Sequence, residues 1–261
     1  MYRKSDYIAV FDSGVGGISV LRQLRKYMPR ERFLYYGDSA NAPYGSRPTE
    51  QVRALTLAAA EKILAQPVKA LVVACNTATA AAIQALREKY PDLIVVGIEP
   101  ALKLAADQFP GGRIGVMATE VTLREEKFDA LLHRFEKNTT VFKIPAPGLV
   151  ELIEQGNAHS REAEELISQL LAPYRGKLDA LVLGCTHYPF AAEAIQKALD
   201  PEVALLDGGE GTARETLRRL EAADLLFQGP GEVVWQNSAG VEAVLALSQQ
   251  LLESEGSKHN V

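Results

Sequence analysis

The sequence predicts an α/β protein of two similar lobes, each a mostly parallel sheet flanked by helices, with the functional site between the lobes. Short apolar runs alternate with longer helical patterns almost from end to end, which is typical of β-α-β units around a parallel sheet. The stretches ALVVACNTAT (70–79) and ALVLGCTHYP (180–189) follow one pattern, which indicates an internal duplication of a strand and its following loop. A chain of 261 residues is long enough for one large domain or two lobes.

The first series of elements lies in residues 7–97. Its strands are short runs of apolar residues, many of them β-branched or aromatic, and we expect them at 7–11, 32–36, 70–74 and 93–97. The segments between them have helical periodicity, and we expect helices at 16–28, 49–65 and 78–90.

The series then restarts after residue 112. We expect strands at 113–117, 140–144, 180–184 and 203–207, and helices at 121–135, 147–156, 160–174 and 189–199. The tail from residue 208 to about 255 is predicted to be helical and to pack back on the first lobe. The expected lobes are residues 1–97 plus 207–261 and residues 98–206.

The composition favours a small-molecule ligand. With 28 basic and 33 acidic residues the formal net charge is -5, which argues against a nucleic-acid or anionic-membrane partner. No apolar run approaches a membrane span or a signal-peptide core, so we expect a cytoplasmic protein. Two cysteines are too few for a structural zinc site unless histidines join them, and a disulfide is not expected in a reducing compartment.

The informative motifs follow expected strands, where ligands bind in a parallel sheet. FDSGVGG places Asp12 and Ser13 at a strand tip before a glycine-rich turn, but it lacks the spacing of a dinucleotide fingerprint and the lysine of a phosphate loop. Two other loops could bind a ligand. Taken alone, the pattern of the first favours an ordinary turn, and the second could equally be a helix cap. These loops contribute Pro43, Tyr44 and Gly45, and Thr119 and Thr122.

The cysteines provide the most reactive groups. Cys75 and Cys185 each follow a strand and precede a helix, where we expect the helix dipole to lower a thiol pKa. A cysteine hydrolase could pair Cys185 with His187, but that interpretation leaves Cys75 without a role. Two matched thiols suit a reaction that needs equivalent groups on opposite faces of a carbon, one removing a proton and the other returning one.

The whole set of motifs resembles the cofactor-independent aspartate/glutamate racemase family, and glutamate racemase in particular. The resemblance rests on FDSGVGG, GDSANAPYGSR, VVACNTATA, IGVMAT and LGCTHYP, in that order, and covers nearly the whole chain. It implies interconversion of L- and D-glutamate, D-glutamate for bacterial peptidoglycan, no metal or pyridoxal phosphate, and a homodimer. The CNTAT and CTHYP segments favour glutamate, and the alternatives are a racemase for aspartate or a related acid and a non-catalytic amino-acid-binding protein.

The resemblance also implies roles for individual residues. Cys75 and Cys185 would exchange protons with the substrate, assisted by Asp12 near Cys75, by His187 near Cys185, and by Glu151 as a further carboxylate. The substrate contacts expected from the motifs are Asp12, Ser13, Pro43, Tyr44, Gly45, Asn76, Thr77, Thr119, Thr122, Thr186 and His187.

Overall fold

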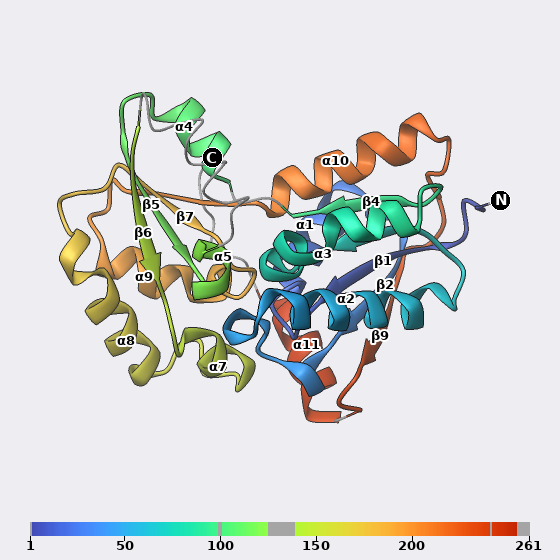
Figure 1. The fold of residues 1–261 in the computed structure, drawn as a ribbon, viewed down its shortest axis with the longest axis horizontal. Coiled ribbons are helices and arrows are strands. Elements are labelled where there is room, and N and C mark those ends of the chain that lie inside the picture. Colours follow the sequence, from blue (N-terminus) through green and yellow to red (C-terminus); the bar gives the residue numbers. More distant parts are fainter. Residues whose placement is uncertain (1, 99–100, 125–138, 241, 255–261) are drawn as a thin grey trace.

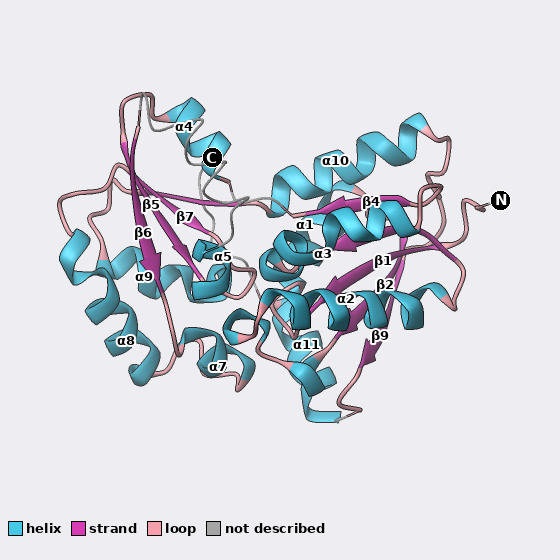
Figure 2. Cartoon of the chain, viewed as in Figure 1, coloured by secondary structure: helices cyan, strands magenta, loops and turns pink. Residues whose placement is uncertain are grey.

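The protein, in a computed structural model, consists of two parallel sheets with helices packed on them, as Figures 1 and 2 show. The structure describes residues 2–98, 101–124, 139–240 and 242–254. The sheet that contains β1 to β4 lies on the right of Figure 1, and the sheet that contains β5 to β7 lies on the left. The expected α/β class with two sheets is therefore confirmed.

The first sheet has five parallel strands in the order β4-β3-β1-β2-β9. They span Tyr7–Asp12 (β1), Arg32–Gly37 (β2), Val68–Val73 (β3), Ile94–Gly97 (β4) and Glu232–Asn237 (β9). The last strand corrects the expectation of an entirely helical tail. It is a half-buried strand at the edge of the sheet, paired along its length with β2, and its apolar run is short, from Val233 to Trp235.

Helices cover both faces of this sheet. They span Ile18–Tyr27 (α1), Thr49–Leu64 (α2), Asn76–Lys89 (α3), Gly209–Ala222 (α10) and Glu242–Glu253 (α11). Alternate residues of each strand face opposite sides, so Val10 and Tyr35 join the core beneath α1, whereas Phe11 and Tyr36 join the core beneath α2 and α3. Helix α1 packs against both α10 and α11.

The second sheet has four parallel strands in the order β6-β5-β7-β8. They span Arg113–Ala118 (β5), Thr140–Pro145 (β6), Ala180–Leu183 (β7) and Ala204–Asp207 (β8). Its helices span Leu102–Gln108 (α4), Glu120–Arg124 (α5), Leu149–Glu154 (α7), Arg161–Leu171 (α8) and Ala192–Ala198 (α9). Helix α4 was not expected, and of the helix expected at 121–135 the part from 125 onward lies outside the described residues.

The two sheets present strand ends to each other. The chain leaves the first sheet after β4 and returns from β8 into α10. Asp12 at the end of β1 accepts a hydrogen bond from Thr186, which follows β7. The expected arrangement of loops facing one another between two sheets is therefore present at this junction.

A buried ion pair lies in the first lobe, away from the junction. The Lys69 ammonium is 0% exposed and bonds both carboxylate oxygens of Glu31, which is 1% exposed. Lys69 also donates to the carbonyls of Lys4 and Leu225, and Glu31 accepts from the Phe227 amide. The pair therefore joins the N-terminal segment, β3 and the chain that follows α10.

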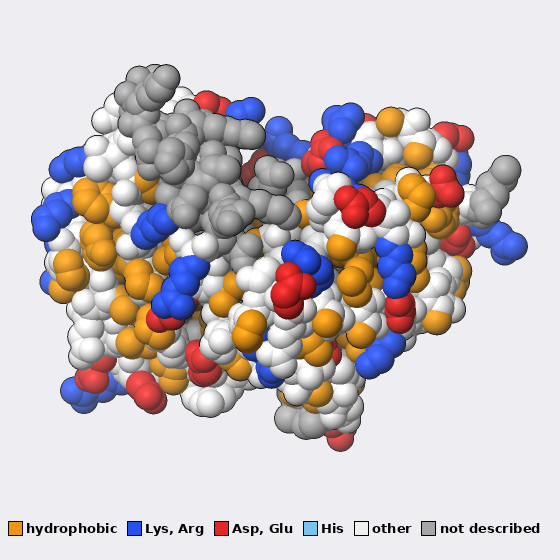
Figure 3. All heavy atoms as spheres, viewed as in Figure 1, with side chains coloured by type: hydrophobic (Ala, Val, Ile, Leu, Met, Phe, Trp, Pro, Cys, Tyr) orange, Lys and Arg blue, Asp and Glu red, His pale blue; other side chains and the backbone are white. Residues whose placement is uncertain are grey.

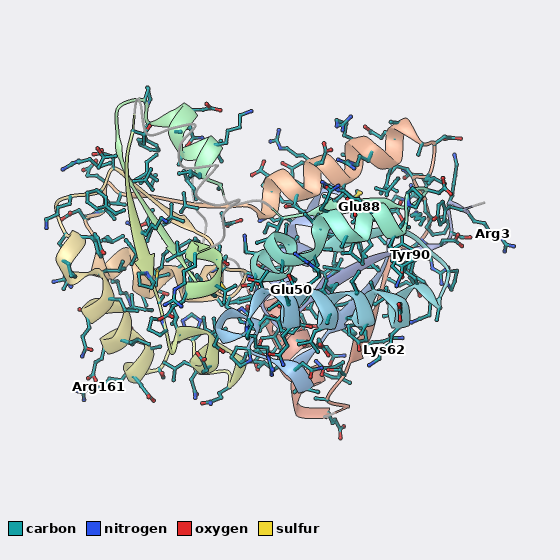
Figure 4. The ribbon with its side chains drawn as sticks, viewed as in Figure 1. Arg3, Glu50, Lys62, Glu88, Tyr90 and Arg161 are labelled. Carbon is teal, nitrogen blue, oxygen red and sulfur yellow. The ribbon has the colours of Figure 1, made fainter. Side chains whose placement is uncertain are left out.

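The surface carries charges of both signs. Figure 3 shows basic and acidic side chains interspersed with apolar ones over the face in view. The labelled charged residues of Figure 4, among them Glu50 and Lys62 on α2 and Arg161 on α8, are exposed. In the part of the chain that the structure describes, no helix is long and apolar enough to cross a membrane.

Candidate active site

Each cysteine lies at the start of the loop or helix that follows a strand, as the sequence predicts. Cys75 caps α3, where its sulfur accepts from the Ala78 amide at 3.4 Å and lies 3.6 Å from the Ser13 hydroxyl. Cys185 follows β7, and its sulfur lies 3.5 Å from Nδ1 of His187. Both are free thiols, 5% and 7% exposed. The two lobes thus contribute one buried thiol each.

Asp12 lies between the lobes. One carboxylate oxygen accepts from the Gly14 amide at 2.9 Å, and the other accepts from the Thr186 hydroxyl at 3.0 Å. Burial raises the pKa of Asp12 above its ordinary value. Burial, followed by the charge of Asp12, raises the pKa of Cys75 to about 12. The expected lowering of this thiol's pKa by the helix dipole is therefore wrong, because burial outweighs the favourable amide contact.

The Cys185 side has a different environment. Nε2 of His187 lies 2.5 Å from a Glu154 carboxylate oxygen, and the same oxygen accepts from the Val15 amide at 2.8 Å. Burial opposes a charge on His187, but its contacts with Cys185 and Glu154 raise its pKa well above the ordinary value. Burial also opposes the Glu154 charge, and its bonds to His187 and Val15 lower its pKa nevertheless. The imidazole of His187 is therefore held between the Glu154 carboxylate and the Cys185 sulfur.

The carboxylate beside His187 is Glu154, not the expected Glu151. Both lie on α7, but Glu151 is exposed and lines a surface groove with residues of α8. Leu152 and Ile153 face the core, and Glu154 at the end of the helix extends to the other lobe. Two acidic residues three positions apart on one short helix leave the sequence ambiguous, and only the contact across the lobes distinguishes them.

Two glycines permit close approach of the lobes. A Cβ on Gly14 would lie 1.8 Å from a Glu154 oxygen, and a Cβ on Gly16 would lie 2.5 Å from the Thr186 hydroxyl oxygen. The Ser19 hydroxyl donates to the Thr186 carbonyl at 2.8 Å and adds another contact. A glycine-rich turn after a first strand often leaves room for a nucleotide phosphate. Here the glycines of FDSGVGG leave room for side chains from the other lobe.

Three threonine hydroxyls meet across the junction. Thr77 at the start of α3 lies 3.1 Å from Thr119 and 3.3 Å from Thr122, and those two are 3.0 Å apart. Thr119 also accepts from the Thr122 amide, so it caps α5 as well. Gly45 lies against Thr119, since a Cβ on Gly45 would be 2.6 Å from the threonine methyl. The structure brings both threonine loops and the Gly45 loop together.

The loop around Tyr44 is held by a buried carboxylate. The Tyr44 hydroxyl donates to Asp38 at 2.6 Å, and the Asn41 amide nitrogen donates to the same carboxylate. Pro43, preceded by a cis peptide bond, leads into the 3-10 turn Tyr44–Ser46. Because the phenol of Tyr44 already bonds Asp38, the groups that this turn can offer to a ligand are backbone amides.

Asn76 lies next to Cys75 in the first turn of α3. Its side-chain oxygen is buried and has no hydrogen-bond partner among the residues that the structure describes. Such an acceptor suits a donor group on a bound molecule. Within the described ranges, no cluster of three or more His, Cys, Asp or Glu residues has a geometry that could hold a metal ion.

Two lobes that each direct a thiol, a carboxylate and hydroxyl groups to a shared junction define an isomerase class, the amino-acid racemases that use side-chain acids and bases. The pattern that defines the Asp/Glu/hydantoin racemase family matches residues 17–216. A glutamate racemase of Clostridium botulinum is 45% identical over 257 residues, which cover 97% of this chain and 100% of that protein. The chain therefore belongs to the Asp/Glu/hydantoin racemase family and is an amino-acid racemase.

Solved structures have the same fold. The glutamate racemase of Thermus thermophilus, in complex with β-chloro-D-alanine, is 39% identical, and the match has a TM-score of 0.82 and covers 95% of this chain and 94% of that one. The glutamate racemase of Francisella tularensis, in complex with D-glutamate, is 27% identical, with a TM-score of 0.84 and coverage of 97% and 95%. These relatives support a glutamate racemase function.

Proposed function

We propose that the protein interconverts L- and D-glutamate by two-base proton transfer at the α-carbon, with Cys75 and Cys185 as the two acid/base groups. The observation that carries the proposal is the pair of buried thiols, one from each lobe, with Asp12 near Cys75 and with His187, which bonds Glu154, beside Cys185. The glutamate racemases similar to this chain include one with D-glutamate bound, which supports glutamate as the substrate. A one-base reaction would leave one of these thiols without a role.

The two thiols have different surroundings, which supports a division of labour. A pKa of about 12 keeps Cys75 a thiol at neutral pH, whereas Cys185 lies beside His187, whose pKa is raised well above its ordinary value. Cys185 takes the α-proton of L-glutamate, and the electron pair of the broken C–H bond delocalises into the α-carboxylate. The Cys75 thiol then donates its proton to the opposite face, giving D-glutamate and a Cys75 thiolate. Proton exchange with solvent restores the starting state.

Hydroxyl, amide and backbone groups would hold the substrate. The buried oxygen of Asn76 suits the ammonium group of an amino acid, which is a donor. Hydroxyls and backbone amides can bind carboxylates without an arginine. The proposed substrate-binding set is Asp12, Ser13, Pro43, Tyr44, Gly45, Asn76, Thr77, Thr119, Thr122, Thr186 and His187, with Glu154 in place of Glu151 beside the catalytic histidine.

Solvent hydrogen tests the two-thiol step. In deuterated water, D-glutamate formed early from L-glutamate is expected to carry deuterium at the α-carbon, because the hydrogen that Cys75 delivers is not the one that Cys185 removed. The remaining L-glutamate should stay largely protiated. Mass spectrometry of the separated enantiomers at low conversion measures both. Substantial protium in the product would contradict two-base transfer even if racemisation itself were observed. L-Aspartate in parallel measures selectivity.

Three wider proposals accompany this one. We propose that the D-glutamate supplies peptidoglycan synthesis, that the protein forms a homodimer, and that the lobes comprise residues 1–97 plus 207–261 and residues 98–206. Apart from Asp207, the last residue of β8, the strands of the two sheets fall on either side of these boundaries, which supports the third proposal. Light scattering of the purified protein tests the dimer, and a mass of one chain across concentrations would exclude it.

A further inference from the structure

Tyr35 is a buried phenol that the proposed reaction does not use. It lies on β2, is 1% exposed, and its ring packs 5.4 Å from that of Trp235 on β9. Its hydroxyl donates to the Gly14 carbonyl at 2.7 Å. That carbonyl belongs to the turn after β1, which contacts the second lobe. Tyr35 is thus bonded directly to the turn that meets Glu154.

The Gly14–Val15 peptide has partners at both ends. Its oxygen accepts from Tyr35, and its N–H, on Val15, donates to Glu154 at 2.8 Å. Glu154 bonds His187 at 2.5 Å, and His187 lies 3.5 Å from the Cys185 sulfur. Hydrogen bonds at the two ends of one peptide group polarise and align each other. A continuous series of contacts therefore runs from Tyr35 to the Cys185 thiol.

Glycines keep both sides of this peptide clear. A Cβ on Gly37 would lie 2.8 Å from the Gly14 carbonyl oxygen, and a Cβ on Gly14 would lie 1.8 Å from a Glu154 oxygen. Real Cβ atoms do not approach other heavy atoms so closely, so a side chain at either position would displace the peptide or the carboxylate. The orientation of the peptide, which follows β1, thus depends on contacts from two other elements, β2 and α7.

Charge favours the same arrangement. Burial, and then the charges of Asp12 and Glu154, raise the pKa of Tyr35 well above its ordinary value, so the phenol stays a protonated donor. The titratable groups that face His187 are Cys185 on its own loop, Glu154 from α7 and Asp12 from β1. Of these, Glu154 is the group that Tyr35 reaches through the peptide.

We propose that Tyr35 is a positioning residue for the Cys185 half of the reaction, acting through the Gly14–Val15 peptide to hold Glu154 against His187. The inference rests on the proposed function, since it assigns Cys185 an acid/base role. Without the Tyr35 hydroxyl the peptide loses one anchor, Glu154 holds the imidazolium less firmly, and proton transfer by Cys185 slows. Transfer by Cys75 should change less, because Cys75 bonds Ser13 and Ala78 and has no contact with Glu154 or His187 among those described.

The test compares Tyr35→Phe with Tyr36→Phe, the same chemical change at the adjacent residue on the opposite face of the sheet. For Tyr35→Phe we expect kcat to fall on the order of tenfold, the effect of about one lost hydrogen bond, with KM nearly unchanged. The α-deuterium isotope effect should grow with labelled L-glutamate and not with labelled D-glutamate. Tyr36→Phe should match the wild type in both measurements.

The pH profile supplies a readout that a loss of stability would not move. The raised pKa of His187 keeps the imidazolium present through neutral pH, and it is lost as the pH rises through that pKa. Weaker support from Glu154 lowers this pKa, so the alkaline limb of kcat should move to lower pH in Tyr35→Phe. In Gly37→Ala the new methyl group would press on the same Gly14 carbonyl, so the alkaline limb should also move to lower pH. This variant replaces Tyr35→Phe in the test if Tyr35→Phe does not fold.

Three outcomes decide the inference. The inference is supported if Tyr35→Phe gives a direction-dependent isotope effect and a shifted alkaline limb. Both effects should be absent when Tyr35→Phe is added to Glu154→Gln. An unshifted profile in Tyr35→Phe and Gly37→Ala, or a shift that persists in the Glu154→Gln background, overturns it. Failure of the proposed function is recognised separately, since Cys185→Ala alone would then retain racemisation.

Discussion

Replacing Cys75 or Cys185 with alanine is expected to reduce racemisation by roughly 10²- to 10⁴-fold or more, the range that a positioned acid or base contributes. Each thiol is at one face of the proposed substrate position, so neither can do the other's task. The fold should persist, because alanine fits in the space of each buried cysteine and the remaining contacts are unaffected. Optical rotation follows turnover, and circular dichroism checks folding.

The single variants also separate the two half-reactions. Cys75→Ala keeps Cys185, so in deuterated water it should still exchange the α-hydrogen of L-glutamate without forming D-glutamate. Cys185→Ala should exchange only D-glutamate. Wild-type turnover in either variant would show that its thiol is not an acid/base group, and exchange of the same enantiomer in both would contradict the assigned sides.

Lys69→Met is expected to lower the free energy of unfolding by about 3–5 kcal/mol, the effect of leaving a buried carboxylate without its partner. Glu31 is 1% exposed and would keep only its bonds to backbone amides. Urea denaturation measures the change. The double variant Glu31→Gln/Lys69→Met should recover a large part of the loss, because no buried charge then remains unpaired.

Lys62→Met provides the matched control, since Lys62 lies on α2 and is exposed (Figure 4). It should change the unfolding free energy by less than about 0.5 kcal/mol. If Lys69→Met changed the unfolding free energy as little as Lys62→Met, the buried pair would not stabilise the first lobe.

The sequence predicts most of the fold and the central groups of the candidate site. Alternating apolar and helical patterns predict both sheets, and the repeated strand-to-cysteine segment predicts that Cys75 and Cys185 come from separate lobes. Residues that follow parallel strands lie at one end of their sheet, which explains why the pattern alone predicts Asp12 at a strand tip. The roles of Thr77 and Thr186 are expected only from the resemblance to the racemase family.

The remaining features depend on contacts between distant segments. Glu151 and Glu154 are equivalent acids on one short helix until the first lobe is placed beside it. The pKa of Cys75 depends on how completely the fold buries the sulfur, which outweighs the helix-dipole effect that its position predicts. Tyr35 has the pattern of an ordinary core residue, and its hydroxyl contact with Gly14 exists only in the folded chain.

The position of β9 affects the order in which a ribosome-bound chain can fold. Strand β2 can pair with β1 as soon as both have been synthesised, but its other edge pairs with residues 232–237, which are synthesised after all the strands of the second sheet. Until then β2 has no partner on that edge, and Tyr35 lacks the Trp235 ring that packs against it. The second sheet can therefore be complete in the nascent chain while the first still has an open edge.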